Sequence, residues 1–172
     1  SMPVFDMRFY KFIASGERYF PISNNLTFKI RGQAGYADSY GSKKYPFFKN
    51  FYMGGPKSVR GFDQASIGKK TVNPVTGEYE TTGGKHSGFA SAEFYFPPPG
   101  LKNVQSFRLS TFLEGGGVFK NDFDTDEMRF SAGVGALWLS PFGPLTISYA
   151  KPLNEGTNDQ VSTLQFGMGG AF

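Results

Sequence analysis

The most distinctive chemistry in the sequence lies in Val59-Arg60-Gly61-Phe62, within the stretch 38–87, which has no sustained strand or helix period. Connections this long are uncommon between patterned segments, and those that occur are usually functional or disordered. The guanidinium of Arg60 presents a planar fork of donors that suits a carboxylate, and Gly61 permits a backbone bend beside it. Arg60 therefore either binds acidic partners elsewhere in the fold or is a solvated loop residue.

Other groups of polar residues lack the spacing that catalysis or metal binding requires. Gly83-Gly84-Lys85-His86-Ser87 fails as a phosphate loop, because Tyr79 replaces the required first glycine and no Ser or Thr follows the lysine directly. His86 is the single histidine and has no partner at a useful spacing, and the sequence contains no cysteine. The acidic cluster at 122–127 lacks the glycine and the distal glutamate of an EF-hand. We therefore predict no catalytic residue, no cofactor and no metal site.

Length and composition favour a single all-β domain. The 172 residues include 23 glycines and 20 phenylalanines, and 39% of them are hydrophobic, which is typical of short strands joined by many turns. The formal net charge is +4, and the basic residues are scattered along the chain. A concentrated basic surface for nucleic acid is therefore not expected.

A period-two alternation of apolar with small or polar residues predicts about seven antiparallel strands. It is clearest on either side of Ser140-Pro141-Phe142-Gly143-Pro144, where Phe130–Trp138 and Leu145–Tyr149 alternate. These prolines also exclude a membrane helix across the uncharged stretch 130–150. Residues 8–20 form a further strand, but the pattern does not settle which face is which. The same alternation occurs in Leu26–Ile30, Ala92–Phe96, Leu109–Leu113 and Leu164–Met168.

The links between these strands alternate in length. One end of the predicted sheet has short, turn-like links and the other has longer polar ones, which is typical of an outer-membrane barrel. Aromatic residues near the strand ends, such as Phe20, Phe96 and Trp138, suit the two interfaces of a membrane. The short links are Pro21–Asn25, Pro97–Asn103 and Ser140–Pro144, and the longer ones are Asp38–Ser87, Lys120–Glu127 and Asn154–Gln160.

Periodicity alone leaves two architectures open. A soluble β-sandwich or lipocalin-like barrel would turn the apolar faces inward, whereas a membrane barrel would turn them toward lipid. The Gly, Ser, Thr and Ala residues on the polar faces favour the membrane barrel, because a solvated exterior usually carries Lys and Glu. We therefore predict an antiparallel transmembrane β-barrel segment with one long lumenal loop. Because single-chain bacterial barrels have even strand numbers, about seven strands indicate a partial barrel.

Several motifs resemble the BamA family, the barrel subunits of the bacterial outer-membrane β-barrel assembly machinery. They are the run Tyr45–Gly55 leading into Val59–Phe62, then Ser91-Ala92-Glu93-Phe94, Leu137–Leu145 and the terminal Phe172. The resemblance implies that residues 3–172 are the C-terminal part of an assembly-factor barrel, with the POTRA domains and the N-terminal barrel strands absent. Residues 1–2 look like a cloning remnant.

The resemblance also implies roles for particular residues. In this family the arginine loop folds back into the lumen, where its arginine meets acidic residues of the inner wall; the matching positions are Arg60, Glu93 and Glu114. The alternation independently puts both glutamates on the polar faces of neighbouring strands. The family's terminal strand pairs weakly with the first barrel strand to form a lateral gate, and its glycines either loosen that seam or only relieve crowding in the lumen. The matching terminal residues are Phe166, Gly167, Gly169, Gly170 and Phe172.

The function implied by the resemblance is assembly and insertion of β-barrel proteins in the bacterial outer membrane, without enzyme activity. The expected partners are unfolded outer-membrane proteins, accessory assembly lipoproteins and the lipid bilayer. The alternative is a two-partner secretion or related transport barrel, which shares the arginine loop. Because the first and last strands expose unpaired backbone groups, we expect the chain either to join edge to edge in oligomers or to curl until these edges meet.

Overall fold

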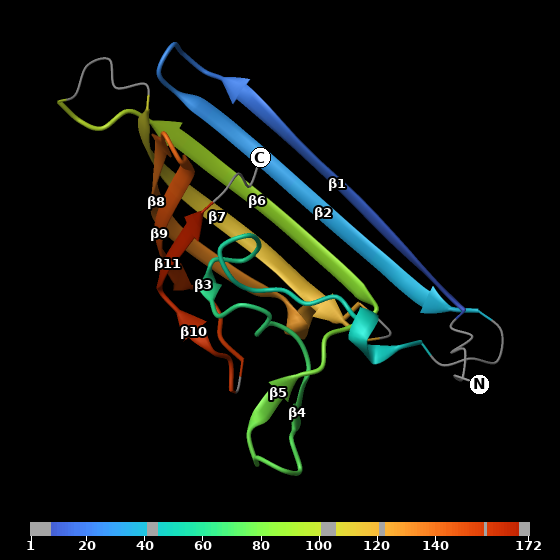
Figure 1. The fold of residues 1–172 in the computed structure, drawn as a ribbon. Helices are drawn as coiled ribbons and strands as arrows, with labels where there is room; N and C mark the ends of the chain where they lie inside the picture. Colours follow the sequence, from blue (N-terminus) through green and yellow to red (C-terminus); the bar gives the residue numbers. More distant parts are fainter. Residues whose placement is uncertain (1–7, 41–44, 101–105, 121–122, 157, 169–172) are drawn as a thin grey trace.

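The computed structural model describes residues 8–40, 45–100, 106–120, 123–156 and 158–168, and its main feature is one antiparallel sheet of seven strands (Figure 1). The strands pair in chain order, β1-β2-β6-β7-β8-β9-β11. The predicted all-β, antiparallel fold and the strand number are confirmed. The strands are β1 (Phe9–Pro21), β2 (Thr27–Ser39), β6 (His86–Phe96), β7 (Phe107–Phe119), β8 (Arg129–Ser140), β9 (Gly143–Pro152) and β11 (Leu164–Met168).

The predicted alternation of short and long links holds only in part: the links 22–26 and 141–142 are short, but 97–106 between β6 and β7, predicted to be short, has 10 residues, and 120–128 between β7 and β8, predicted to be long, has 9. Only Pro141 and Phe142 separate β8 from β9, because Ser140 pairs with Gly143 and closes a tighter turn than the sequence indicated. At the opposite end of the strands, residues 40–85 between β2 and β6 form the longest link. This long link contains η1 (Phe47–Lys49), β3 (Gly61–Phe62), β4 (Lys70–Val72) and β5 (Tyr79–Thr81), while η2 (Thr125–Glu127) and β10 (Val161–Ser162) lie in the other two links at that end.

The register of β1 settles the face assignment that the sequence left open. Directly opposed residues of an antiparallel pair share a face, and Glu17 is opposite Arg31 while Tyr19 is opposite Lys29. Lys29 is buried, and its Nζ lies 3.1 Å from Oε2 of Glu17. Glu17 and Tyr19 therefore lie on the polar face of the sheet, and Phe20 lies on the apolar face.

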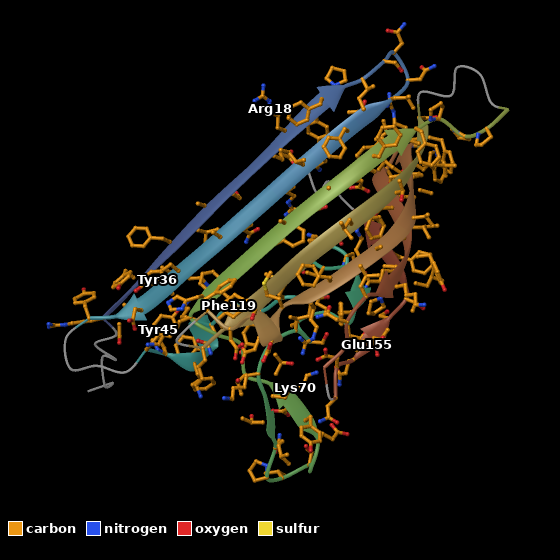
Figure 2. The ribbon with its side chains drawn as sticks, turned by 180° about the vertical axis from the view of Figure 1, so that it is seen from behind. Arg18, Tyr36, Tyr45, Lys70, Phe119 and Glu155 are labelled. Carbon is orange, nitrogen blue, oxygen red and sulfur yellow. The ribbon has the colours of Figure 1, made fainter. Side chains whose placement is uncertain are left out.

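The two faces of the sheet are reversed relative to those of a soluble protein. Polar side chains are buried on the side that carries the long link, where Ser131 is 0% exposed and Glu114 is 4% exposed. Apolar side chains are exposed on the other face, where Leu113 is 53% exposed and Val134 is 55% exposed; Figure 2 views the sheet from behind. An apolar exterior around a polar interior suits a barrel wall that faces lipid. The soluble alternative is therefore wrong.

A small apolar core fills the space between the long link and the inner face of the sheet. Val59, Phe62 and Ile67 of the link are fully buried in it. A Cβ at Gly35 of β2 would lie 2.6 Å from the ring of Phe51, so only glycine lets the link approach the wall this closely. The long link is therefore packed against the sheet, and the motif it carries has a fixed position.

The sheet is open, with β1 and β11 as its two edges. Among the described residues these edges are not paired with each other, so the predicted curled arrangement in which they meet is not observed. Gly169, Gly170, Phe172 and residues 1–2 lie outside the described residues. In the described part of the chain, no helix has the length and apolar character needed to cross a membrane.

Candidate functional site on the inner wall

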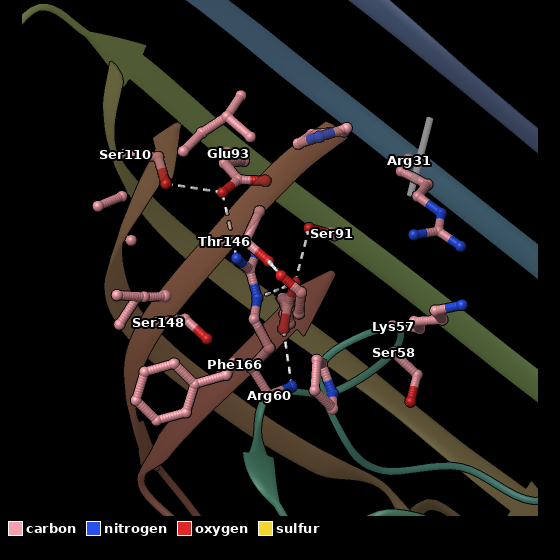
Figure 3. A pocket seen from close by; sticks show the side chains of 18 of the residues that line it. Arg31, Lys57, Ser58, Arg60, Ser91, Glu93, Ser110, Thr146, Ser148 and Phe166 are labelled. Atoms are coloured by element: carbon pink, nitrogen blue, oxygen red, sulfur yellow. Dashed lines mark hydrogen bonds and ion pairs between the residues drawn. The ribbon is translucent and has the colours of Figure 1, made fainter. Parts of the chain in front are cut away.

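The arginine motif reaches the inner wall because Gly61 adopts a backbone conformation that other residues rarely take. Its φ is +93°, and a Cβ there would lie 3.3 Å from the Cβ of Ala150 on β9. Gly61 and Phe62 form β3, which pairs with β10. The bend and this pairing direct the preceding residue, Arg60, toward β6 and β7 (Figure 3).

Arg60 is bound by two carboxylates from neighbouring strands, Glu114 of β7 and Glu93 of β6 (Figure 3). Glu114 accepts three hydrogen bonds from Arg60: from the backbone N to Oε2 at 2.8 Å, and from Nε and Nη2 to Oε1 at 2.9 and 2.6 Å. Glu93 accepts one, from Nη1 to Oε1 at 3.2 Å. The structure thus brings together the three residues that the resemblance paired, and Glu114 is the main partner.

Polar side chains of the wall hold both carboxylates in place. Ser110 and Tyr95 each donate to Glu93, at 2.8 Å to Oε1 and 2.8 Å to Oε2. Ser91 donates to Oε1 of Glu114 at 3.3 Å. In the register of β6 and β7, Ser91 is opposite Glu114 and Tyr95 is opposite Ser110, so all five side chains share the inner face.

An aromatic ring completes the site beneath the guanidinium. Cζ of Arg60 lies 3.4 Å from the ring centroid of Phe112, a buried residue of β7 that is opposite Glu93. This geometry is a cation–π contact in a site that is largely closed to water. Gly133 of β8 makes room for the ring, because a Cβ there would lie 2.5 Å from Cζ of Phe112.

Burial strengthens the interactions of this cluster. The side chains of Arg60, Glu93 and Glu114 are 13%, 11% and 4% exposed. Burial alone would lower the pKa of Arg60, but the charges and hydrogen bonds of Glu114 and then Glu93 outweigh it and raise that pKa. Within the described residues, no group of three or more His, Asp or Glu side chains could hold a metal ion. The cluster is suited to clamp a loop onto the wall through charge-assisted hydrogen bonds.

Four residues of this site were not predicted as site residues: Ser91, Tyr95, Ser110 and Phe112. The period-two alternation that puts the glutamates on the inner face puts these four residues there as well, and this is the signal that could have identified them. The alternation does not reveal the register between β6 and β7, and this register decides which inner-face residues surround Arg60.

The two described residues of the predicted terminal-strand set, Phe166 and Gly167, lie at the edge of the sheet and line the same cavity as the Arg60 cluster. Phe166 is exposed and is opposite Ile147 of β9, while Gly167 is opposite Thr146. The strand also contacts the arginine motif, because Nε2 of Gln165 donates to the carbonyl oxygen of Phe62 at 2.7 Å. This buried contact was not predicted.

The fold and the site together define a segment of a transmembrane β-barrel whose inner wall binds an arginine-bearing loop. Residues 2–172 match the family model described as the Omp85 superfamily domain. The chain belongs to the Omp85 superfamily.

Relatives of the chain include proteins named outer membrane protein assembly factor BamA. The protein from Neisseria meningitidis serogroup B is 34% identical over 200 residues, which cover 100% of this chain and 25% of that protein. The protein from Nitratidesulfovibrio vulgaris is 28% identical over 97% of this chain and 21% of its own length. The crystal structure of BamA from Haemophilus ducreyi lacking POTRA domains 1–3 matches with a TM-score of 0.85 at 29% identity, covering 96% of this chain and 35% of that one. This chain therefore spans about a quarter of the length of the first of these curated relatives.

Proposed function

We propose that this chain is part of a factor that assembles and inserts β-barrel proteins in the bacterial outer membrane. The observation that carries the proposal is 34% identity over the whole chain to a protein named as an outer membrane protein assembly factor. The apolar, exposed outer face of the sheet supports a location in that membrane, because such a face is stable only against lipid or another apolar surface.

The proposed mechanism is non-enzymatic and uses strand pairing. An unfolded outer-membrane protein would add its strands to an exposed sheet edge, where backbone hydrogen bonds supply affinity. β11 is such an edge among the described strands, and Gly167 within it adds no side-chain packing. The Arg60 cluster would keep the lumenal loop on the wall while the edge changes partners. Accessory assembly lipoproteins are proposed as further partners.

The test uses the protein at its full natural length in liposomes, with chaperone-bound barrel proteins as substrates. Folding of the substrate is followed by its heat-resistant gel mobility, and acceleration over empty liposomes is expected. Arg60→Ala should lower the acceleration, whereas Lys57→Ala, an exposed cation of the same loop, should leave it unchanged. Ion conductance without any acceleration would contradict the proposal and favour the transport barrel.

We also propose that the isolated chain associates through its open edges. β1 and β11 each present unpaired backbone donors and acceptors in apolar surroundings, which favours pairing with another copy. The mass of the chain in detergent micelles should correspond to more than one copy. A monodisperse monomer whose β1 and β11 amides exchange as slowly as those of β7 would contradict this.

A further inference from the structure

A second buried ion cluster lies in the link between β9 and β11. It centres on Asp159, whose carboxylate is 4% exposed. Lys70 approaches Oδ1 at 2.8 Å, Arg129 donates from Nε to Oδ2 at 2.5 Å, and the backbone N of Gly156 donates to Oδ2 at 2.7 Å. Both carboxylate oxygens are therefore satisfied by donors from three segments of the chain.

The two cations, Lys70 and Arg129, come from different parts of the fold, and each makes further hydrogen bonds of its own. Lys70 begins β4 in the long link, at the base of the hairpin in Figure 2, and its Nζ also donates to the carbonyl oxygen of Asn158. Arg129 begins β8, and its Nη1 also donates to the carbonyl oxygens of Asp126 and Met128 at 2.7 and 3.0 Å. Asp159 thus ties its own link both to the long link and to the sheet.

The residues that follow Asp159 form hydrogen bonds with the arginine motif and with the residues directly after it. The carbonyl oxygen of Gln160 accepts from the backbone N of Asp63 at 2.9 Å and from Oγ of Ser66 at 3.3 Å. β10 then pairs with β3, and Gln165 donates to the Phe62 carbonyl oxygen at 2.7 Å. The chain from Asp159 to Gln165 therefore enters β11 while bonded to the loop that carries Arg60.

β11 depends on this support more than the other strands do. Within the described residues, which end at Met168, it pairs over 5 residues and only with β9, whereas β7 pairs over 11 residues with β6 and 10 with β8. A short edge strand with one neighbour opens at low free-energy cost unless other contacts hold it. The contacts on the arginine loop are the additional ones that the structure provides.

We infer that Asp159 is a positioning residue that fixes the start of β11 on the arginine loop, so that the pairing of β11 and the docking of Arg60 are coupled. Lys70 and Arg129 hold Asp159, β10 holds β3, and Gln165 holds the Phe62 carbonyl. One part of the inference rests on the proposed function: release of the contacts that hold β11 would make its edge available to a substrate strand.

The test is hydrogen exchange of the protein at its full natural length in lipid nanodiscs. Asp159→Asn removes the charge that binds both cations, and Glu155→Gln removes an exposed charge from the same link as the matched control. We expect Asp159→Asn to raise the exchange rates of residues 161–168 about tenfold, with β8 unchanged, and Glu155→Gln to have no effect. Asp159→Glu, which keeps the charge, should restore part of the protection.

Arg60→Ala tests whether the docking of Arg60 affects the pairing of β11. It should raise exchange at 161–168, although in the described part of the chain the hydrogen bonds of the Arg60 side chain go to Glu114 and Glu93 and not to these residues. If Asp159→Asn does not fold, Lys70→Met, which removes one cation, takes its place. Unchanged exchange at 161–168, or an equal rise in β8 and β9, would overturn the inference. Failure of the wild type to accelerate substrate folding would instead refute the proposed function and leave these exchange results intact.

Discussion

Two buried ion clusters hold the long link, and they are built in opposite ways. In the first, one cation, Arg60, lies between two carboxylates, Glu93 and Glu114, which project from adjacent strands of the wall. In the second, one carboxylate, Asp159, lies between two cations, Lys70 and Arg129, which belong to different segments. Each cluster places its shared central group on a link and takes at least one partner from the sheet.

The difference lies in what each cluster supports. β6 and β7 are paired on both sides, so the wall that carries the glutamates keeps its shape without the arginine. The segment after Asp159 leads into β11, which lies at the edge of the described sheet and pairs there only with β9. Loss of a partner in the first cluster should therefore lower the free energy of unfolding, because a buried charge is left unpaired. Loss of a partner in the second cluster should instead weaken the pairing of β11 with β9.

The largest effect is expected from Glu114→Ala, which leaves Arg60 buried without its main partner. Removing one member of a buried ion pair typically costs about 3–5 kcal/mol. We expect a loss of that size in the free energy of unfolding, measured by urea denaturation in detergent micelles. Glu155→Ala, at an exposed site, should change it by less than about 0.5 kcal/mol. A loss below about 1 kcal/mol for Glu114→Ala would mean that lumenal water solvates the pair.

The next effect separates the two glutamates. Glu114 accepts three hydrogen bonds from Arg60 and Glu93 accepts one longer one, so the coupling energy should be larger for the first pair. Double-mutant cycles of Arg60→Ala with Glu114→Ala and with Glu93→Ala measure the two couplings, with values of about 0.5–3 kcal/mol expected. Simple additivity of both double mutants would show that no coupling exists.

The sequence predicted the parts of this molecule that repeat with the strand period. The alternation in Phe130–Trp138 identified a strand and its two faces, and the prolines after it identified a turn. The direction of the faces did not follow from periodicity, since an apolar side can face a core or a lipid equally well. The exposure of Val134 beside the buried Ser131 settles it.

Only those residues of the candidate site that belong to a recognisable sequence motif could be predicted. Arg60 stands out by its motif, and the family resemblance supplied Glu93 and Glu114. Phe112 carries only the alternation, which puts it on the inner face; its place beneath the guanidinium depends on the β6–β7 register and on the space left by Gly133. Asp159 was likewise passed over, since its partners lie 89 and 30 residues away in the sequence.

The Asp159 cluster should respond to pH in a direction set by its partners. Burial alone would raise the pKa of Asp159, but hydrogen bonds from Lys70, Arg129 and the Gly156 amide lower it below its usual value. A group with a lowered folded pKa contributes stability that is complete above its unfolded pKa, about 3.9, and is lost as the pH falls through the folded pKa. The difference in unfolding free energy between wild type and Asp159→Asn should therefore be about 1.5–3 kcal/mol and constant from pH 7 to about pH 5. It should disappear in stronger acid, and a difference that grows on acidification would contradict the assignment.

The smallest effect is expected from Phe112→Leu, which tests the aromatic floor of the first cluster. Leucine keeps an apolar side chain on the wall but removes the ring beneath the guanidinium, and such a cation–π contact contributes about 0.5–2 kcal/mol. The hydrogen bonds of Arg60 to Glu114 do not involve the ring and should remain, so the loss in unfolding free energy should stay well below that of Glu114→Ala. Phe130→Leu on the apolar face serves as the control for loss of a ring without a cation. If the ring acts through Arg60, the effect of Phe112→Leu should shrink when Arg60 is already alanine, whereas the effect of Phe130→Leu should not change. Equal effects of Phe112→Leu with and without Arg60 would show that the ring only fills space above Gly133.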